Sequence, residues 1–90
     1  MAIVVRFDVK GMDSSKYDQI IRKLEQIGQG APAGRMYHVC YGDRQSLQVI
    51  DVFESPALLD AFGQKLMPIL KELGVEAKPE PAEVYNIIEG

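Results

Sequence analysis

The apolar residues of this chain switch repeatedly between two spacings, and the order of these spacings restricts the fold more than any other feature. Apolar residues recur at helical spacing between Asp13 and Gly28 and again between Ser55 and Gly74, which predicts two amphipathic helices. Four other segments are rich in β-branched and aromatic residues and predict strands: 2–9, 35–41, 47–54 and 84–88. The predicted order is therefore β-α-β-β-α-β.

Prolines modify this pattern at two places. Pro68 removes one backbone hydrogen bond inside the second helix, so we expect a kink near residues 64–65 or a break into two pieces. The connection 75–83 contains further prolines, which cannot donate to a β-ladder. We therefore expect regular pairing of the last strand to begin only after Pro81.

The length of 90 residues suits one domain, because two domains sharing it would each be too small to bury a core. The most economical packing is a ferredoxin-like α+β domain over residues 1–90, with a four-stranded antiparallel sheet and both helices on one face. Right-handed crossovers then give the strand order 4-1-3-2. The other face of the sheet is left for solvent, a partner or a ligand.

Charge and composition exclude several classes of function. The net charge of −3 argues against nucleic-acid binding, which requires a basic surface. No segment is long and apolar enough to span a bilayer, so we expect no membrane association. Cys40 is the only cysteine, and one cysteine can form neither an internal disulfide nor a cysteine-based zinc site. We therefore expect a cytoplasmic protein without a metal centre.

Strand alternation predicts which residues line the open face. The apolar side chains of the first strand should face the helices, so Arg6 faces outward. A four-residue turn from Asp43 to Ser46 would place His38 opposite Asp51, whereas a three-residue turn would shift the register and separate them. We favour the four-residue turn, because it leaves the helix side of the hairpin uncharged. The residues predicted to share the open face are Arg6, His38, Cys40, Asp51 and Phe53, joined by Asn86 if the last strand has the matching parity.

His38 and Asp51 are the candidate catalytic residues. A neutral imidazole oriented by a carboxylate can act as a general base and take a proton from a phenol or an enol. The alternative is structural, because a buried histidine bonded to a carboxylate at an interface shows the same pattern. A carboxylate in mid-strand is disfavoured unless it is exposed or paired. Asp51 therefore orients His38, accepts a substrate hydroxyl, or pairs with Arg6 of the adjacent strand.

Three further residues are candidates for ligand binding. The guanidinium of Arg6 suits a planar anion such as a carboxylate or phenolate, although it could instead neutralise Asp8 or Asp51. Phe53 would form a wall of a pocket, and Asn86 would add a polar group. A half-apolar face with a few convergent polar groups suits a ligand cavity and equally a dimer interface.

Three stretches of the sequence resemble the dimeric α+β barrel superfamily, in particular its small antibiotic-biosynthesis-monooxygenase-like proteins. They are the opening VVRFDVKGM, the strand entry PAGRMYHV, and IDVFESPALLDAF running into a helix that carries LMPIL. The resemblance implies a homodimer in which two ferredoxin-like sheets face each other. Haem-degrading members use an Asn, a Trp and a His on the second helix. This chain has no Trp, and residues 56–73 contain no His, so the resemblance does not extend to haem.

The resemblance also implies a function for the candidate site. It points to a cofactor-independent monooxygenase-like enzyme that acts on a small aromatic or enolic molecule and needs no cofactor. His38 would be the base, Asp51 its orienter, Arg6 an anion anchor and Phe53 a pocket wall. The alternative is a non-catalytic small dimeric protein, a binding or stress-associated module whose polar face only holds the dimer together. The fold does not choose between enzyme and binding protein, because unrelated functions share it.

Overall fold

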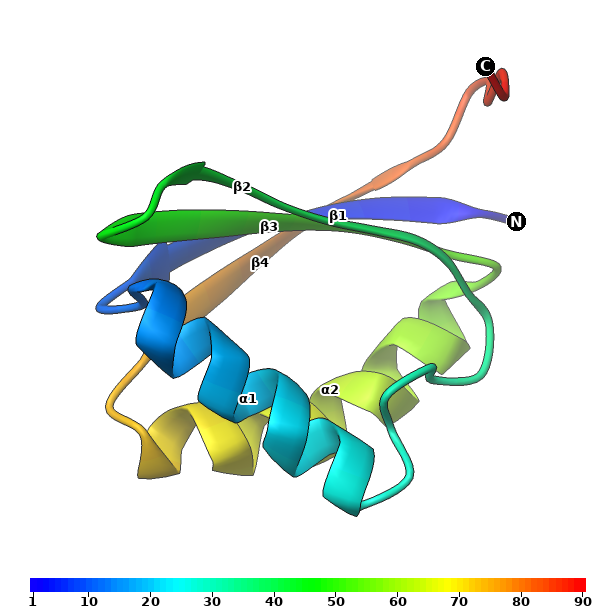
Figure 1. Ribbon diagram of the computed structural model, residues 1–90. Coiled ribbons are helices and arrows are strands. Elements are labelled where there is room, and N and C mark those ends of the chain that lie inside the picture. The colour runs from blue at the N-terminus through cyan, green and yellow to red at the C-terminus, as the bar shows by residue number, and fades with distance from the viewer.

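The computed structural model describes every residue from Met1 to Gly90. Its elements are β1 (Ile3–Lys10), α1 (Ser14–Gln26), β2 (Arg35–Asp43), β3 (Ser46–Phe53), α2 (Pro56–Glu72) and β4 (Glu76–Glu83). The strands form one antiparallel sheet in the order β2-β3-β1-β4, and both helices cover the same face of it (Figure 1). The predicted ferredoxin-like α+β fold and the predicted strand order are confirmed.

The core lies between the sheet and the two helices. The apolar residues of β1, from Ile3 to Val9, are buried at every second position, as predicted. Val5 and Phe53 are fully buried, and burial of side chains of this size stabilises the fold by roughly 1.5–3 kcal/mol each. The helices contribute one buried stripe each, formed by Ile20 and Leu24 of α1 and by Phe62, Leu66, Ile69 and Leu70 of α2.

The helix α2 is continuous through Pro68, so the predicted break into two pieces does not occur. A proline inside a helix costs about 3 kcal/mol, because it removes a hydrogen bond and its ring meets the preceding turn. Leu66 precedes Pro68 and Ile69 and Leu70 follow it, and all three are buried against the rest of the core. Packing on both sides of the proline therefore holds the helix together, since tertiary contacts supply most helical stability in proteins.

The last strand was predicted at the wrong place. The strand β4 pairs with the whole of β1 and includes Pro79 and Pro81, whereas residues 84–90 have no regular structure. A sheet tolerates proline on an edge strand when the ring nitrogen faces away from the neighbouring strand. Pro79 and Pro81 are two positions apart, so both nitrogens point toward the free edge and the ladder to β1 stays intact.

The register of the β2–β3 hairpin agrees with the prediction. His38 lies opposite Asp51, and Gly42 lies opposite Leu47. The ladder continues to the pair Asp43 and Ser46, so only residues 44 and 45 remain at the tip of the hairpin. One irregularity interrupts the ladder between residues 35 and 37, where the strand β2 contains an extra residue.

The side of the sheet on which the hairpin residues lie is opposite to the prediction. In the β1–β3 ladder, Asp51 lies opposite Val5 and Phe53 lies opposite Ile3. Directly opposed residues of an antiparallel pair point to the same face, so Asp51 and Phe53 lie on the helix-covered face, and His38 lies there too. The prediction assumed that the helix side excludes charge. A carboxylate can be buried there because a hydrogen-bonded partner offsets much of its desolvation cost.

The open face of the sheet is partly apolar. One row across the strands contains Val39 of β2, Ile50 of β3, Arg6 of β1 and Glu80 of β4. Val39 is 51% exposed and Ile50 is half-buried, so apolar atoms reach solvent between the charged groups. None of the helices has the length and apolar character needed to cross a bilayer.

Candidate functional site

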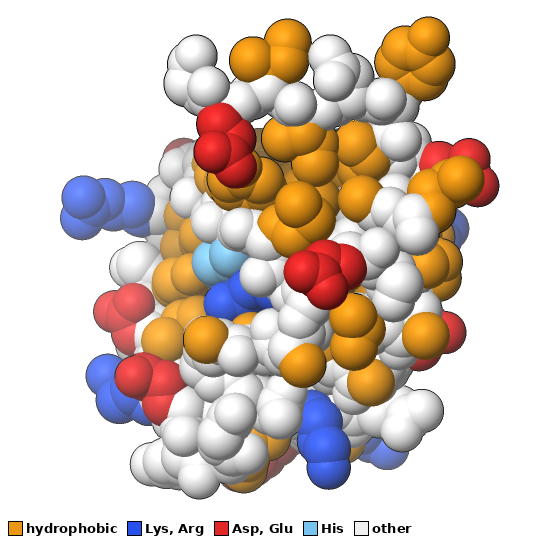
Figure 2. Space-filling view, turned by 90° about the vertical axis from the view of Figure 1, so that its right-hand side faces the viewer, with side chains coloured by type: hydrophobic (Ala, Val, Ile, Leu, Met, Phe, Trp, Pro, Cys, Tyr) orange, Lys and Arg blue, Asp and Glu red, His pale blue; other side chains and the backbone are white.

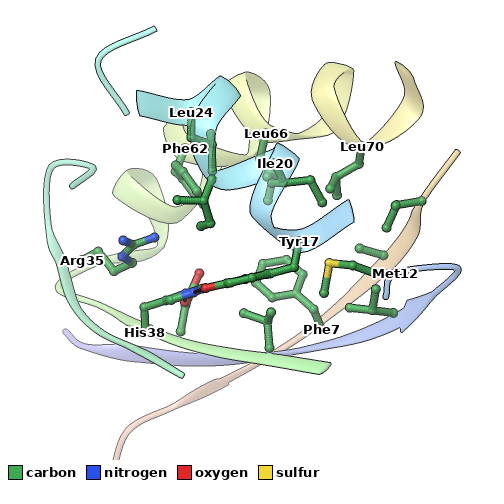
Figure 3. Close-up of a pocket in the computed structure, with 16 residues that line it drawn as sticks. Phe7, Met12, Tyr17, Ile20, Leu24, Arg35, His38, Phe62, Leu66 and Leu70 are labelled. Carbon is green, nitrogen blue, oxygen red and sulfur yellow. Dashed lines mark hydrogen bonds and ion pairs between the residues drawn. The ribbon is translucent and has the colours of Figure 1, made fainter. Parts of the chain in front are cut away.

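A cavity of about 50 Å³ lies between the sheet and the helices, inside a single chain (Figure 3). This is several times the volume that one water molecule requires. Most of its wall is apolar and comes from both layers of the fold, for example from Phe7, Ile20, Leu24, Phe62 and Leu66. The polar groups on the wall belong to Tyr17, Arg35, His38 and Asp51. An apolar cavity with a few convergent polar groups is the usual form of a small-molecule site.

The cavity is open at one end of the molecule. Figure 2 views the end of Figure 1 at which the loop between α1 and β2 approaches the start of α2. It shows the only histidine of the chain at the surface, next to a basic side chain and surrounded by apolar atoms. The side chain of His38 is 22% exposed, whereas that of Asp51 is 2% exposed. A ligand that enters from this end would therefore meet His38 before it meets Asp51.

His38 and Asp51 form the inner part of a hydrogen-bonded chain. The Nδ1 atom of His38 lies 2.5 Å from Oδ1 of Asp51. The two side chains are held by neighbouring strands, because they are a directly opposed pair in the β2–β3 ladder. This contact gives the buried carboxylate a hydrogen-bond partner. No buried side-chain nitrogen or oxygen of the whole polypeptide lacks one.

Tyr17 extends the chain by one more hydrogen bond. Its Oη atom lies 2.7 Å from Nε2 of His38, and the two ring planes are inclined by only 6°. Tyr17 reaches the site from the first turns of α1, which crosses the sheet above β2 and β3 (Figure 3). Burial raises the pKa of Tyr17 above its ordinary value, and the nearby Cys40 adds to this effect while Arg35 opposes it. The phenol therefore stays protonated at neutral pH.

The contacts are compatible with one arrangement of protons for a neutral imidazole. In it, the Tyr17 hydroxyl donates to Nε2 of His38, which is then the unprotonated ring nitrogen. The other nitrogen, Nδ1, then carries the proton and donates it to the carboxylate of Asp51. The order of a hydroxyl, an imidazole base and an orienting carboxylate is the arrangement by which enzymes activate a hydroxyl group.

Arg35 is the only arginine on the cavity wall, and no lysine lies there. Its Nη2 atom donates to the backbone carbonyl oxygen of Gly30 at 3.2 Å, and its Cζ atom lies 5.7 Å from the centre of the Phe62 ring. No carboxylate lies within ion-pair distance of its guanidinium, in contrast to Arg6, which is paired to Glu80. Arg35 thus presents an unneutralised positive charge at the site.

Cys40 lies on the same face as His38, opposite Val49. Burial raises the pKa of its thiol above the ordinary value, although a hydrogen bond with Tyr17 opposes the rise. The thiol is therefore protonated at neutral pH and is a poor nucleophile. No group of three or more His, Cys, Asp or Glu side chains lies close enough together to hold a metal ion.

The structure places the three predicted ligand-binding residues away from this cavity. Arg6 lies on the open face, where Nε and Nη2 donate to Oε1 of Glu80 at 3.0 and 2.7 Å, so it contacts neither Asp51 nor His38. Phe53 is fully buried in the core against Phe62, with 5.6 Å between the ring centres. Asn86 is exposed in the irregular C-terminal segment. Of the five predicted site residues, only His38 and Asp51 line the cavity.

Sequence reasoning missed Tyr17 and Arg35 as site residues. Tyr17 lies within the apolar helical pattern predicted between Asp13 and Gly28, and it packs against the core. The signal that could have drawn attention to it is chemical, because it is the only residue with a polar tip in an otherwise aliphatic stripe. Arg35 gave no such signal. Its spacing of three from His38 would place the two side chains on opposite faces of a regular strand.

Comparisons with known proteins agree with this fold. The sequence matches no protein-family model and no curated protein sequence. Among solved structures, the chain is similar to SnoaB, a cofactor-independent oxygenase from Streptomyces nogalater, with a TM-score of 0.61 and 16% identity over 99% of this chain and 96% of that one. It is also similar to a proposed antibiotic biosynthesis monooxygenase from Deinococcus radiodurans, with a TM-score of 0.65 and 13% identity over 99% and 97% of the two chains.

A third similar structure is a proposed monooxygenase from Shewanella loihica PV-4, with a TM-score of 0.58 and 16% identity over 96% of each chain. These three structures are named as an oxygenase or as proposed monooxygenases, and they share the ferredoxin-like fold of this chain, as the resemblance predicted. At this identity the likeness carries the fold alone. The function has to be argued from the site.

Proposed function

We propose that this protein is a cofactor-independent monooxygenase-like enzyme that oxidises a small aromatic or enolic molecule. The observation that carries the proposal is the hydrogen-bonded chain from Tyr17 through His38 to Asp51 on the wall of an otherwise apolar cavity. A base in an apolar site is suited to removing a weakly acidic proton, because the transferred charge is held by fixed groups and not by water. The shared fold with a cofactor-independent oxygenase supports the same proposal.

The first step is a proton transfer along the hydrogen bonds from the substrate through Tyr17 to His38. A phenol or enol in the cavity gives its proton to Oη of Tyr17, while the Tyr17 hydroxyl proton passes to Nε2 of His38 over the 2.7 Å contact. The products are a substrate enolate, a neutral tyrosine and an imidazolium that Asp51 stabilises through Nδ1. A positioned acid–base group of this kind typically contributes about 10²–10⁴-fold to a rate.

The second step uses dioxygen as co-substrate. The enolate transfers one electron to dioxygen, and the resulting substrate radical and superoxide combine to form a carbon–oxygen bond. The peroxide anion takes back the proton from the imidazolium of His38 by way of Tyr17, which returns the site to its starting state. The peroxide-bearing carbon then loses its hydrogen as a proton, and the electron pair of that C–H bond forms the carbonyl group as the oxygen–oxygen bond breaks. The released hydroxide and proton leave as water. One oxygen atom enters the product, the other leaves as water, and the substrate itself supplies the electrons.

We also propose that the protein acts as a homodimer in the cytoplasm. The half-apolar open face, with Val39, Tyr41 and Ile50 reaching solvent, is suited to packing against the same face of a second copy. Because the helices already cover the other face, this is the side on which a second sheet can be added. The lone Cys40 fits a reducing compartment, where disulfides do not form.

The alternative function is a non-catalytic dimeric binding or stress-associated protein. One observation favours it: every buried polar side-chain atom already has a partner, as expected of a purely structural network. The two functions differ in whether dioxygen is consumed. An enzyme of the proposed type consumes dioxygen with a suitable substrate, whereas a binding protein does not.

The test is oxygen uptake by the purified protein with phenols, naphthols and cyclic 1,3-diketones, in the presence of a metal chelator. We expect uptake above the spontaneous rate that falls about 100-fold or more in His38→Ala. The control is Asp60→Asn, which removes an exposed charge on α2 away from the cavity and should leave the rate unchanged. Absence of uptake with the whole panel, or equal uptake by His38→Ala, would favour the binding protein.

A further inference from the structure

The two charged groups of the cavity differ in their partners. The carboxylate of Asp51 accepts a hydrogen bond from the side chain of His38. The guanidinium of Arg35 has no side-chain partner, because its hydrogen bond goes to a backbone carbonyl oxygen. By contrast, Arg6 and Lys23 are each paired with a glutamate, Glu80 and Glu72. The guanidinium of Arg35 is therefore the one charged group on the cavity wall without a side-chain partner.

A β-bulge in β2 directs the side chain of Arg35 into the cavity. Arg35 lies opposite Phe53, which faces the helices, although Arg35 and His38 are three residues apart in the chain. Both can share one face only because the ladder shifts by one residue between positions 35 and 37. Bulges of this kind often redirect a side chain beside a functional site. In Figure 3, Arg35 accordingly projects inward from β2 toward Phe62 and lies on the same side of the sheet as His38.

The surroundings fix the position of the guanidinium but leave most of its donors free. One nitrogen is held by the carbonyl oxygen of Gly30, and the planar group lies near the ring of Phe62. The remaining N–H groups of Arg35 have no hydrogen-bond partner in the chain. An arginine offers paired donors whose geometry matches a carboxylate, so a held but unpaired guanidinium is suited to binding one.

We propose that the ligand of this cavity is an anionic one, a small single-ring aromatic or enolic carboxylic acid, and that Arg35 binds its carboxylate. The apolar part of the ligand would lie among Phe62, Leu66 and Ile20, with its acidic hydroxyl toward Tyr17. This inference rests on the proposed function for the orientation of the hydroxyl. The binding of the carboxylate is independent of any reaction. Arg35 thus takes the place that Arg6 was expected to have as the anion anchor.

The test compares two ligands of the same shape, benzoate and benzamide, by titration followed with ¹H–¹⁵N NMR at neutral pH. We expect benzoate to bind the wild-type protein roughly tenfold more tightly than benzamide, since a hydrogen bond between two charged groups is much stronger than one to a neutral group. The resonances that shift should belong to residues around Arg35 and Phe62. The substitution Arg35→Gln should remove the preference for the anion, while Arg22→Gln on the exposed side of α1 should keep it.

Three outcomes would overturn the proposal: equal affinity of the wild type for the two ligands, an unchanged preference in Arg35→Gln, or no binding of benzoate. Its failure is distinguishable from failure of the proposed function. Binding of benzoate through Arg35 without oxygen uptake by any compound would leave the anion site standing and remove the oxygenase. Oxygen uptake with neutral phenols that is unaffected by Arg35→Gln would support the oxygenase and contradict the anion site.

Discussion

His38 of β2 and Asp51 of β3 are direct cross-strand neighbours whose side chains meet at 2.5 Å on the helix-covered face of the sheet. Asp51 is the only buried charged residue of the core. In the β1–β3 ladder it lies opposite Val5, which is fully buried. The coupling energy between the two side chains and the positions of their protons can therefore be measured.

The coupling between His38 and Asp51 should appear in a double-mutant cycle. Either His38→Ala or Asp51→Asn alone should reduce the free energy of unfolding by about 1–3 kcal/mol. The first leaves the buried carboxylate without its partner, and the second replaces the charged acceptor by a weaker neutral one. The double variant should lose clearly less than the sum of the two, by about 1 kcal/mol or more. Urea unfolding measures all four proteins.

The matched control for this cycle is the pair Lys23 and Glu72, which lie 3.1 Å apart on the surface. Exposed pairs are screened by solvent and usually contribute about 0–1 kcal/mol. We expect Lys23→Met and Glu72→Gln to show little coupling. Additive effects of His38→Ala and Asp51→Asn would show that the two residues do not act as a unit.

The imidazole of His38 should be present in one tautomer at neutral pH. Because Tyr17 donates to Nε2 and Asp51 accepts from Nδ1, the proton of the neutral ring should reside on Nδ1. Long-range ¹H–¹⁵N NMR of the single histidine distinguishes the two nitrogens directly. Tyr17→Phe removes the donor at Nε2 and should shift the Nε2 resonance, whereas Tyr85→Phe, at an exposed position, should not. A proton found on Nε2 in the wild type would contradict the assigned chain of donors.

Alkaline pH should destabilise the wild type more than Tyr17→Phe. The folded-state pKa of Tyr17 is raised, chiefly by burial, above the ordinary value of 10.0. The folded state then binds the phenol proton more tightly than the unfolded state, so stability falls as the pH rises above about 10. Urea unfolding of both proteins at pH 8 and pH 11 measures the difference. Equal losses in the two proteins would show that Tyr17 does not ionise on unfolding.

Two glycine substitutions should change stability in opposite directions. Gly34 has a φ of +81°, and an added Cβ would lie 2.3 Å from Cδ1 of Leu58, so Gly34→Ala should be destabilising by about 1 kcal/mol or more. Gly63 lies inside α2 with no atom within 4 Å of an added Cβ. Gly63→Ala should therefore stabilise the protein by up to about 1 kcal/mol. Thermal unfolding compares both with the wild type, and a stabilising Gly34→Ala would mean that this turn is not fixed.

The proposed dimer should depend on the open face of the sheet. Val39→Asp places a charge at the centre of that face, where it would be desolvated between two copies, and should convert a dimer to a monomer. Ala57→Asp adds the same charge at an exposed position of α2 on the opposite side and should leave the dimer intact. Sedimentation velocity measures the mass against 10.0 kDa for one chain. A monomeric wild type, or a dimeric Val39→Asp, would contradict the proposed interface.

The positions of the elements follow largely from local patterns. The buried alternation of β1 and the position of α1 between Asp13 and Gly28 agree with the sequence-based prediction. The cross-strand pair His38 and Asp51 was also predictable, because the length of the hairpin turn sets the register. The last strand was not, since the segment 84–88 has strand propensity but forms no ladder, while the proline-containing β4 occupies the available edge of β1.

The sequence by itself determined which residues alternate and which lie opposite each other, because the spacing of side chains is a local property of the backbone. Only the tertiary structure decided which face of the hairpin meets the helices, since alternation defines two faces without saying which is buried. It also decided that Tyr17 from α1 reaches His38 and that the bulge after Arg35 turns its side chain into the cavity. These contacts join residues far apart in the chain, and the free energy that selects them comes from packing the sheet and the helices together.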